Sequence, residues 1–180
     1  MIKKWEKQGS KIVYGDRRIK VREDQVKMSD GQVEDWTVVE EVNGTAIGAL
    51  TDDNKLVLIR ENRVGADEVM WHLPAGYFDK EDKTKEEGAR RELLEETGYN
   101  AGEIICLFEF HRAPCRYTQR MSYYLARDLV LEKQKLDTTE DIEVVLKNFE
   151  EVLQMIDRGE ITDIETVVVV LMIDRYLRKK

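Results

Sequence analysis

The sequence predicts an α/β protein, and three observations support this class. Short segments of alternating or continuous apolar residues, separated by turn residues, are typical of β-strands. Residues 85–97 place apolar side chains on one face of a possible helix. Two further helical segments follow residue 149. With 180 residues, the chain is long enough to bury a core as one domain, or as one domain with an appendage.

The first expected strands cover residues 11–14, 19–23 and 36–42, where the side chains alternate in character. Asp30-Gly31 is a turn sequence between the last two. Trp36, in the third strand, is a residue type that usually lies in a core or an interface. The N-terminal part of the chain is therefore expected to be made of strands.

A hairpin is expected next, after a turn at Asn43-Gly44. Its strands cover residues 45–50 and 55–60 and flank the turn sequence at residues 52–54. Residues 56–59 form an unbroken apolar run, which indicates a strand that is buried on both faces.

Candidate phosphate-binding and catalytic residues follow this apolar run. Arg60 and Arg63 are either solvated or salt-bridged, or they form a bidentate grip on phosphate. His72 is one of two histidines and is a candidate base, although a structural role is favoured. Pro74 fixes the backbone, and Gly76 lets the chain approach closely before the next helix.

Three carboxylates lie on one side of the helix expected at residues 85–97. Glu92, Glu95 and Glu96 are three or four positions apart, or adjacent, and Gly98 stands where a helix ends in a left-handed cap. Grouped carboxylates repel one another. They are tolerated on a solvated acidic face, or where a hard cation such as Mg²⁺ or Mn²⁺ neutralises them.

The remaining expected elements are three strands followed by two helices. Strands are expected at residues 103–111, 119–126 and 142–149, and residues 132–141 are polar enough for an exposed loop. Helices are expected at residues 150–158, with Gly159 as the stop, and at residues 162–176.

The last of these helices is predicted against local propensity. Its four consecutive valines favour a strand. The length of the segment, a cap at Thr162 or Asp163, and Arg175 and Arg178 near its end favour a helix.

Charge and composition exclude several function classes. The net charge of −8 argues against a nucleic-acid partner, so an anionic substrate would be met by local arginines and metal. Cys106 and Cys115 lack disulfide or metal spacing and are expected to be reduced thiols. The N-terminus lacks a signal-peptide core, and no apolar run approaches the length of a membrane span. A cytoplasmic protein without a membrane partner is expected.

The stretch from Gly76 to Tyr99 resembles the Nudix box, G-x5-E-x7-R-E-U-x-E-E-x-G-U, where U is a bulky apolar residue. Residues 91–99 match it except at Tyr99. One residue is inserted before Arg91, so the first Glu of the pattern falls on Asp82, or on Glu81 or Lys83. The resemblance implies the Nudix fold, a mixed β-sheet sandwiched between helices (α/β/α). It also implies an N-terminal antiparallel β extension at residues 1–42 and a hydrolase domain at 43–180.

Further segments resemble the ADP-ribose pyrophosphatase branch of the Nudix hydrolases, which also includes nucleoside diphosphate sugar hydrolases. Residues 73–76 resemble its entry into the box, and residues 60–63 its arginine-bearing turn. Pro114 lies 16 residues after Gly98, as in ADP-ribose enzymes. Residues 140–144 resemble the loop that carries the catalytic glutamate.

The resemblance implies a role for each matching residue. Mg²⁺, with Mn²⁺ as a possible substitute, would be bound by Glu92, Glu95, Glu96 and the Ala75 carbonyl. Glu140 would position or deprotonate the attacking water, with Asp141 and Glu143 as alternatives, and Glu96 is the other catalytic residue. The substrate-binding candidates are Arg63, Arg60, Trp36 and Pro114. The structural candidates are Gly76, Gly98 and Arg91, which would pair with Glu87 or Glu95.

The implied reaction is hydrolysis of the diphosphate linkage of ADP-ribose to AMP and ribose 5-phosphate. A homodimer is also implied, because the family's N-terminal strands cross to a partner subunit. After Pro114 the chain lacks the Gly and Glu of its relatives, and Arg116 and Arg120 add positive charge. Another nucleoside diphosphate sugar such as GDP-mannose is therefore the nearest alternative substrate. A nucleotide-sensing Nudix protein without catalysis is the third possibility.

Overall fold

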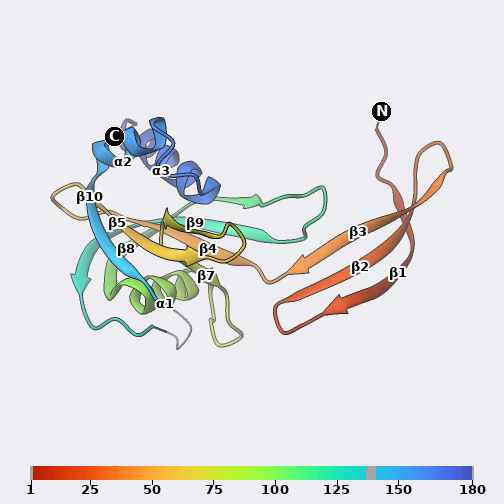
Figure 1. Cartoon of the computed structure of the whole chain (residues 1–180), viewed down its shortest axis with the longest axis horizontal. Helices are drawn as coiled ribbons and strands as arrows, with labels where there is room; N and C mark the ends of the chain where they lie inside the picture. The colour runs from red at the N-terminus through yellow and green to blue at the C-terminus, as the bar shows by residue number, and fades with distance from the viewer. Residues whose placement is uncertain (1, 137–140, 180) are drawn as a thin grey trace. The chain divides into compact units, whose positions relative to one another are not determined.

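The computed structural model describes residues 2–136 and 141–179 (Figure 1). Its contacts divide the chain into two compact units. The first contains the described residues up to Asn43 together with Phe110–Met121, and the second contains the remainder. The predicted α/β class is confirmed, because the second unit combines strands with helices: α1 follows β7, and α2 and α3 follow β10.

The first unit contains a three-stranded antiparallel sheet in the order β1-β2-β3. Its strands are β1 (Glu6–Gly15), β2 (Ile19–Lys27) and β3 (Val33–Glu41), and they contain nearly all of the residues predicted as strands. The predicted turn is present: Gly31 has φ 90°, and its N–H donates to the Met28 carbonyl at 3.0 Å. This conformation favours glycine.

The Pro114 loop belongs to the same unit and pairs with β3. The N–H of Val39 donates to the Arg116 carbonyl at 2.8 Å, and the N–H of Thr118 donates to the Val39 carbonyl at 3.0 Å. Between them, Val39 forms a parallel bridge with Tyr117. Residues 110–121 therefore join the N-terminal unit by contact, although they lie far along the chain.

The second unit contains two sheets, in the orders β7-β4-β9-β8 and β10-β5-β6. The strands are β4 (Gly44–Ala49), β5 (Lys55–Arg63), β6 (Glu68–His72), β7 (Ala75–Tyr77), β8 (Tyr99–His111), β9 (Arg120–Leu131) and β10 (Glu143–Asn148). The first of these is buried along its whole length, and residues 56–59 are fully buried as predicted.

The predicted hairpin between β4 and β5 is wrong. The chain does turn, since the N–H of Thr51 donates to the Lys55 carbonyl at 2.9 Å and Asn54 has φ 60°. Leu50 and Leu56 form a single bridge, and the two strands then enter different sheets. Both edges of β4 are taken by β7 and β9, so β5 pairs with β6 and β10 instead.

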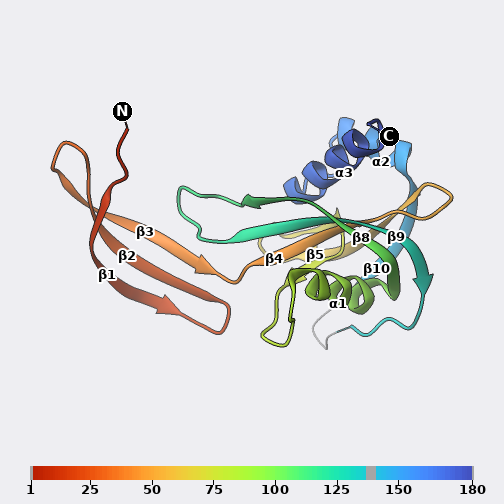
Figure 2. The same cartoon turned by 180° about the vertical axis from the view of Figure 1, so that it is seen from behind.

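The helices lie on opposite sides of these sheets, as Figures 1 and 2 show. Helix α1 (Lys85–Thr97) packs on β4 and β7 from one side. On the other side, α3 (Ile164–Leu177) packs on β4, and α2 (Phe149–Asp157) packs on β5 and β10. This is the predicted arrangement of strands between helices.

The helical prediction for the valine-rich segment is confirmed. Asp163 is its N-cap and accepts the N–H of Thr166 at 2.8 Å. Val169 and Val170 are fully buried, so packing outweighs their preference for strands. The packing is close, because a Cβ on Gly48 would lie 2.2 Å from Ile173 Cδ1. In the described part of the chain, no helix is long and apolar enough to span a membrane.

Candidate active site

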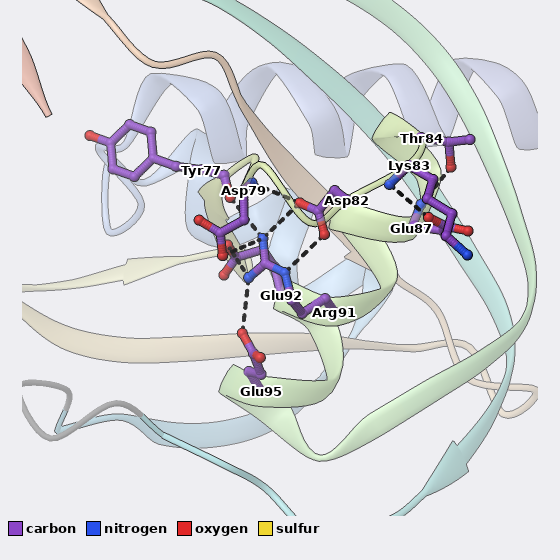
Figure 3. A network of polar contacts seen from close by, with 9 residues as sticks. All are labelled: Tyr77, Asp79, Asp82, Lys83, Thr84, Glu87, Arg91, Glu92 and Glu95. Carbon is purple, nitrogen blue, oxygen red and sulfur yellow. Dashed lines mark hydrogen bonds and ion pairs between the residues drawn. The ribbon is translucent and has the colours of Figure 1, made fainter.

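The acidic helix α1 begins and ends where the sequence predicts. Thr84 caps it by accepting the N–H of Glu87 at 3.1 Å, and the Glu87 carboxylate accepts the N–H of Lys83 at 2.9 Å (Figure 3). At the other end, Gly98 has φ 76° and donates its N–H to the Leu94 carbonyl at 2.8 Å. Both ends are therefore fixed by local hydrogen bonds.

Strand β7 runs directly past two of the carboxylates. Oε2 of Glu96, which is 5% exposed, accepts the N–H of Ala75 at 2.8 Å. A Cβ on Gly76 would lie 2.2 Å from the carboxyl carbon of Glu92, so any other residue here would require the Glu92 side chain or the strand to move. The structure thus brings Ala75, Glu92 and Glu96 together, as the sequence predicts for the metal site.

Arg91 is the centre of the ion-pair network in Figure 3. Its Nε and Nη2 donate to the two carboxylate oxygens of Asp82, at 3.1 and 3.0 Å. Its Nη1 donates to Glu92 at 2.9 Å and to Glu95 at 3.0 Å. Of the two partners that the sequence suggested, Glu95 is engaged, whereas Glu87 belongs to the helix cap.

The Asp82 fork is the contact that the sequence did not predict. Spacing assigns the first glutamate of the box to Asp82, Glu81 or Lys83 and gives none of them a partner. The Asp82 carboxylate also accepts the N–H of Asp79 at 2.8 Å, which fixes the inserted turn before α1. Hydrogen bonds from Arg91 hold the pKa of Asp82 below its usual value, so the pair stays charged.

Glu92 is a carboxylate of the cluster whose charged form is disfavoured by burial. Burial raises the pKa of Glu92 to about 7, although the charge of Arg91 acts in the opposite direction. A buried carboxylate short of positive charge favours binding of a cation.

The residues present suit a hard divalent cation. Glu92, Glu95, Glu96 and the Ala75 carbonyl are oxygen donors, which Mg²⁺ and Mn²⁺ prefer. Within residues 2–136 and 141–179, no three acidic, His or Cys side chains are already gathered in a coordinating arrangement. Nη1 of Arg91 bridges Glu92 and Glu95, so a cation would have to draw these carboxylates from the arginine.

Arg63 lies on β5 and is held by two neighbours. Its Nη1 donates to Glu61 at 3.0 Å, and its Nη2 lies 3.0 Å from Nδ1 of His72. Side chains alternate along β5, so Arg63 and Glu61 share the face of Val57, which belongs to one hydrophobic cluster with Leu93 of α1. The sequence did not pair Arg63 with His72, since their contact depends on the register of β5 with β6.

Arg60 points to the other face of this sheet. It donates to Glu143 at 3.1 Å and lies 4.9 Å from the ring of Trp71, its cross-strand partner. The structure therefore separates Arg60 from Arg63, although the sequence grouped both as substrate-binding candidates. Arg60 also forms an ion pair with Glu143, one of the alternative bases.

Trp36 and the Pro114 loop come together within the first unit. The indole Nε1 of Trp36 donates to the Cys115 carbonyl at 3.0 Å. The Arg116 guanidinium lies 4.4 Å from the Trp36 ring centroid, and Trp5 packs edge-on at 5.9 Å. Trp36 is thus part of an aromatic and cationic cluster with the loop that carries Pro114.

Glu140 lies outside the residues that the structure describes. The segment before it docks on the end of α1, where a helix leaves its carbonyl groups without partners. The Glu132 N–H donates to the Gly98 carbonyl at 2.7 Å, and the Lys135 N–H to the Glu95 carbonyl at 3.0 Å. Gln134 Nε2 donates to the Glu96 carbonyl at 2.5 Å. Residues 132–135 therefore lie against the backbone at the C-terminal end of α1, the helix that carries Glu95 and Glu96.

Comparison with known proteins identifies the relatives of this chain. The model of the NUDIX domain matches residues 42–167. The chain is 26% identical over 170 residues to an ADP-ribose pyrophosphatase of Bacillus subtilis, covering 93% of this chain and 89% of that protein. It is 31% identical over 135 residues to a GDP-mannose pyrophosphatase of Salmonella typhimurium, covering 69% and 70%. A crystal structure of an ADP compounds hydrolase superposes with a TM-score of 0.88 at 22% identity, covering 99% of this chain and 97% of the other.

Proposed function

The chain belongs to the Nudix hydrolase family, and from this premise we propose that it hydrolyses the diphosphate linkage of ADP-ribose to AMP and ribose 5-phosphate, using Mg²⁺. The observation that carries the proposal is the fit of β7 against α1, where Ala75 and Gly76 meet Glu96 and Glu92. The 26% identity to an ADP-ribose pyrophosphatase extends over 93% of the chain and supports this substrate.

Each residue of the cluster has a distinct task in this reaction. Glu92, Glu95, Glu96 and the Ala75 carbonyl would hold the cation. When bound, the cation would offset the charge of the diphosphate and lower the pKa of water. The Ala75 N–H fixes the orientation of Glu96 before substrate arrives. Hydrogen bonds from Arg91 restrict the rotation of the Glu92 and Glu95 side chains.

Two further groups complete the mechanism. Arg63 donates hydrogen bonds to the substrate diphosphate, which a planar guanidinium contacts at two oxygens. Glu140 accepts the proton of the attacking water, as general base.

Product analysis tests the proposal. Purified protein with Mg²⁺ is incubated separately with ADP-ribose, GDP-mannose, UDP-glucose, NADH and diadenosine polyphosphates. We expect ADP-ribose to be consumed far faster than the others, with AMP and ribose 5-phosphate as products. Glu96→Gln protein, purified in the same way, controls for a contaminating hydrolase. Absence of turnover with either Mg²⁺ or Mn²⁺ would contradict the proposal and favour a nucleotide sensor.

Hydrolysis of GDP-mannose is the second candidate. The 31% identity to a GDP-mannose pyrophosphatase over 135 residues favours it, as does the altered sequence after Pro114. Arg116, which that alteration introduces, lies on the Trp36 ring and donates to the Thr37 carbonyl at 3.1 Å. Faster turnover of GDP-mannose than of ADP-ribose would support this candidate and leave the roles of the carboxylates unchanged.

A homodimer is the assembly that we propose. Residues 1–42 would form an extension that exchanges with a second copy of the chain. Support comes from β1, where Ile12, Val13 and Tyr14 are 60%, 47% and 58% exposed. Neighbouring apolar side chains on one strand are costly in water, and burying them against a second copy would stabilise the assembly.

A further inference from the structure

The guanidinium of Arg63 is fixed at both of its terminal nitrogens, and one partner is a buried histidine. His72 is 2% exposed and lies on β6, opposite Ile59 of β5. Its Nδ1 lies 3.0 Å from Nη2 of Arg63, while Nη1 of Arg63 donates to Glu61 at 3.0 Å. His72 therefore contacts a candidate substrate-binding group without being exposed itself.

The charge of Arg63 determines which nitrogen of His72 carries the proton. Arginine has only donors and stays protonated, so its contact with Nδ1 requires a lone pair on that atom. The Leu73 carbonyl also lies 3.0 Å from Nδ1, but it accepts only from the other tautomer. With Nδ1 as acceptor, the proton is on Nε2, and Oε2 of Glu61 lies 3.7 Å from that atom.

Histidine at this position lowers the stability of the fold relative to an apolar side chain of similar size. Among the described residues, Nε2 of His72 is buried and has no hydrogen-bond partner. A buried polar atom without a partner costs free energy that an apolar side chain of similar size would avoid. The contact of Nδ1 with Arg63 is the feature that a leucine at this position would not supply.

We propose that His72 is a positioning residue, which holds the Arg63 guanidinium through Nδ1 before the substrate diphosphate binds. The inference rests on the proposed function, in which Arg63 contacts that diphosphate. A guanidinium has five N–H donors, and the contacts with Glu61 and His72 use one on each terminal nitrogen. The remaining donors are held in a fixed plane, so less conformational freedom is lost when the substrate binds.

Two substitutions separate this role from simple packing. His72→Leu keeps an apolar filling of the site and removes the acceptor, whereas His72→Asn keeps an acceptor oxygen near the position of Nδ1. We expect His72→Leu to raise KM for ADP-ribose about tenfold with little change in kcat, since one charge-assisted contact is lost. His72→Asn should recover most of the affinity. Equal losses in both variants, or a fall in kcat alone, would overturn the inference.

A double-mutant cycle tests whether His72 acts through Arg63. In an Arg63→Ala background, His72→Leu should change KM no further, because the group that it positions is absent. Multiplicative losses in the double variant would show that His72 acts independently of Arg63. Circular dichroism of each variant checks that the fold is retained.

The tautomer provides a measurement on the unmodified chain. The chain has two histidines, and comparison with His72→Asn assigns the ¹⁵N resonances of the imidazole of His72. We expect a protonated Nε2 and a shift of the Nδ1 resonance in Arg63→Ala protein. A proton on Nδ1, or no shift, would overturn the inference whether or not the protein is active. Wild-type protein that hydrolyses no nucleoside diphosphate sugar would instead refute the proposed function.

Discussion

Glu96 combines burial, a backbone hydrogen bond and a place beside two other carboxylates. Glu96→Gln keeps the shape of the side chain and an acceptor for the Ala75 N–H, but removes the negative charge. We expect turnover with Mg²⁺ to fall at least about 10²-fold, with the melting temperature nearly unchanged. Steady-state kinetics and a thermal melt provide the two values.

The matched control for this substitution is Glu86→Gln on the same helix. Glu86 is exposed and pairs only with Arg90 among the contacts described, at 3.1 Å. It undergoes the same chemical change away from β7, so its activity should stay near that of the wild type. Full activity in Glu96→Gln protein would mean that the carboxylate cluster is not the metal site.

His72 makes the stability of the protein dependent on pH. Burial, with help from Arg63, lowers the pKa of His72 to about 4 from the ordinary value of 6.5. The unfolded chain therefore binds the proton first as pH falls. The contribution of His72 to the free energy of unfolding is fully present above pH 6.5 and is lost progressively down to about pH 4. The loss amounts to at most about 3 kcal/mol.

Urea denaturation at several pH values measures this dependence. His72→Asn lacks the titrating group, and the carboxylates titrate in both proteins. The difference between the two free energies of unfolding should therefore change between pH 6.5 and about pH 4. A constant difference over that range would mean that His72 is not buried in its neutral form.

At the scale of elements, the approach of β7 to α1 depends on Gly76. A Cβ there would lie 2.2 Å from the Glu92 carboxyl carbon, so either the strand or the side chain must move. Gly76→Ala should reduce turnover more than tenfold and lower stability by about 1–3 kcal/mol, as overpacking does. Gly65→Ala is the control, because nothing lies within 4 Å of the added atom. Similar behaviour of the two variants would contradict the close approach.

The end of α1 allows a second comparison between glycines. Gly98 and Gly159 both have positive φ, of 76° and 69°. A Cβ on Gly98 would lie 3.1 Å from backbone atoms of Glu132 and Gln134, whereas one on Gly159 meets nothing within 4 Å. Alanine at either position should cost about 1–2 kcal/mol.

Gly98→Ala should in addition lower turnover, because it displaces the segment that leads to Glu140. Thermal melts and steady-state kinetics of the two variants separate the backbone cost from the docking effect. If both variants keep full activity, the docking of residues 132–135 on α1 does not contribute to catalysis.

Local sequence predicted the elements whose ends are fixed locally. Helix α1 has its cap at Thr84 and its stop at Gly98, and Asp163 begins α3. Strands β6 and β7 were not predicted, because Pro74 separates two short segments whose pairing partners are distant in sequence. The divergence of β4 from β5 was missed for the same reason, since competition from β7 and β9 leaves no local trace.

The same distinction applies to the candidate site. Glu92, Glu95 and Glu96 were predicted together because one helix carries all three. The two hydrogen bonds between Arg91 and Asp82 were predictable only in part. Spacing made Asp82 a candidate for the first glutamate of the box, but it did not give the path of the inserted turn. The opposite orientations of Arg60 and Arg63 follow from strand alternation once β5 is known to continue to Arg63. The contact between Arg63 and His72 needed the register of two strands, which the sequence did not provide.

For the whole molecule, the testable quantity is the number of chains. Light scattering of the full chain should give twice its mass of 21.1 kDa. Ile12→Glu places a charge on the exposed side chains of β1 and should shift the mass toward that of one chain. Val130→Glu, at a position 62% exposed on β9, controls for the added charge. A single-chain mass for the wild-type protein would contradict the proposed homodimer.

The contacts of Arg91 with Glu92 and Glu95 make folding of helix α1 independent of cation binding. Nη1 of Arg91 supplies part of the positive charge that Glu92 and Glu95 need, so these two ion pairs form without a bound cation. If activity depends on a divalent cation, as we propose, a newly made chain would fold while such ions are scarce and would become active later without refolding. Scarcity of the ion would then lower activity reversibly and leave the fold of helix α1 unchanged.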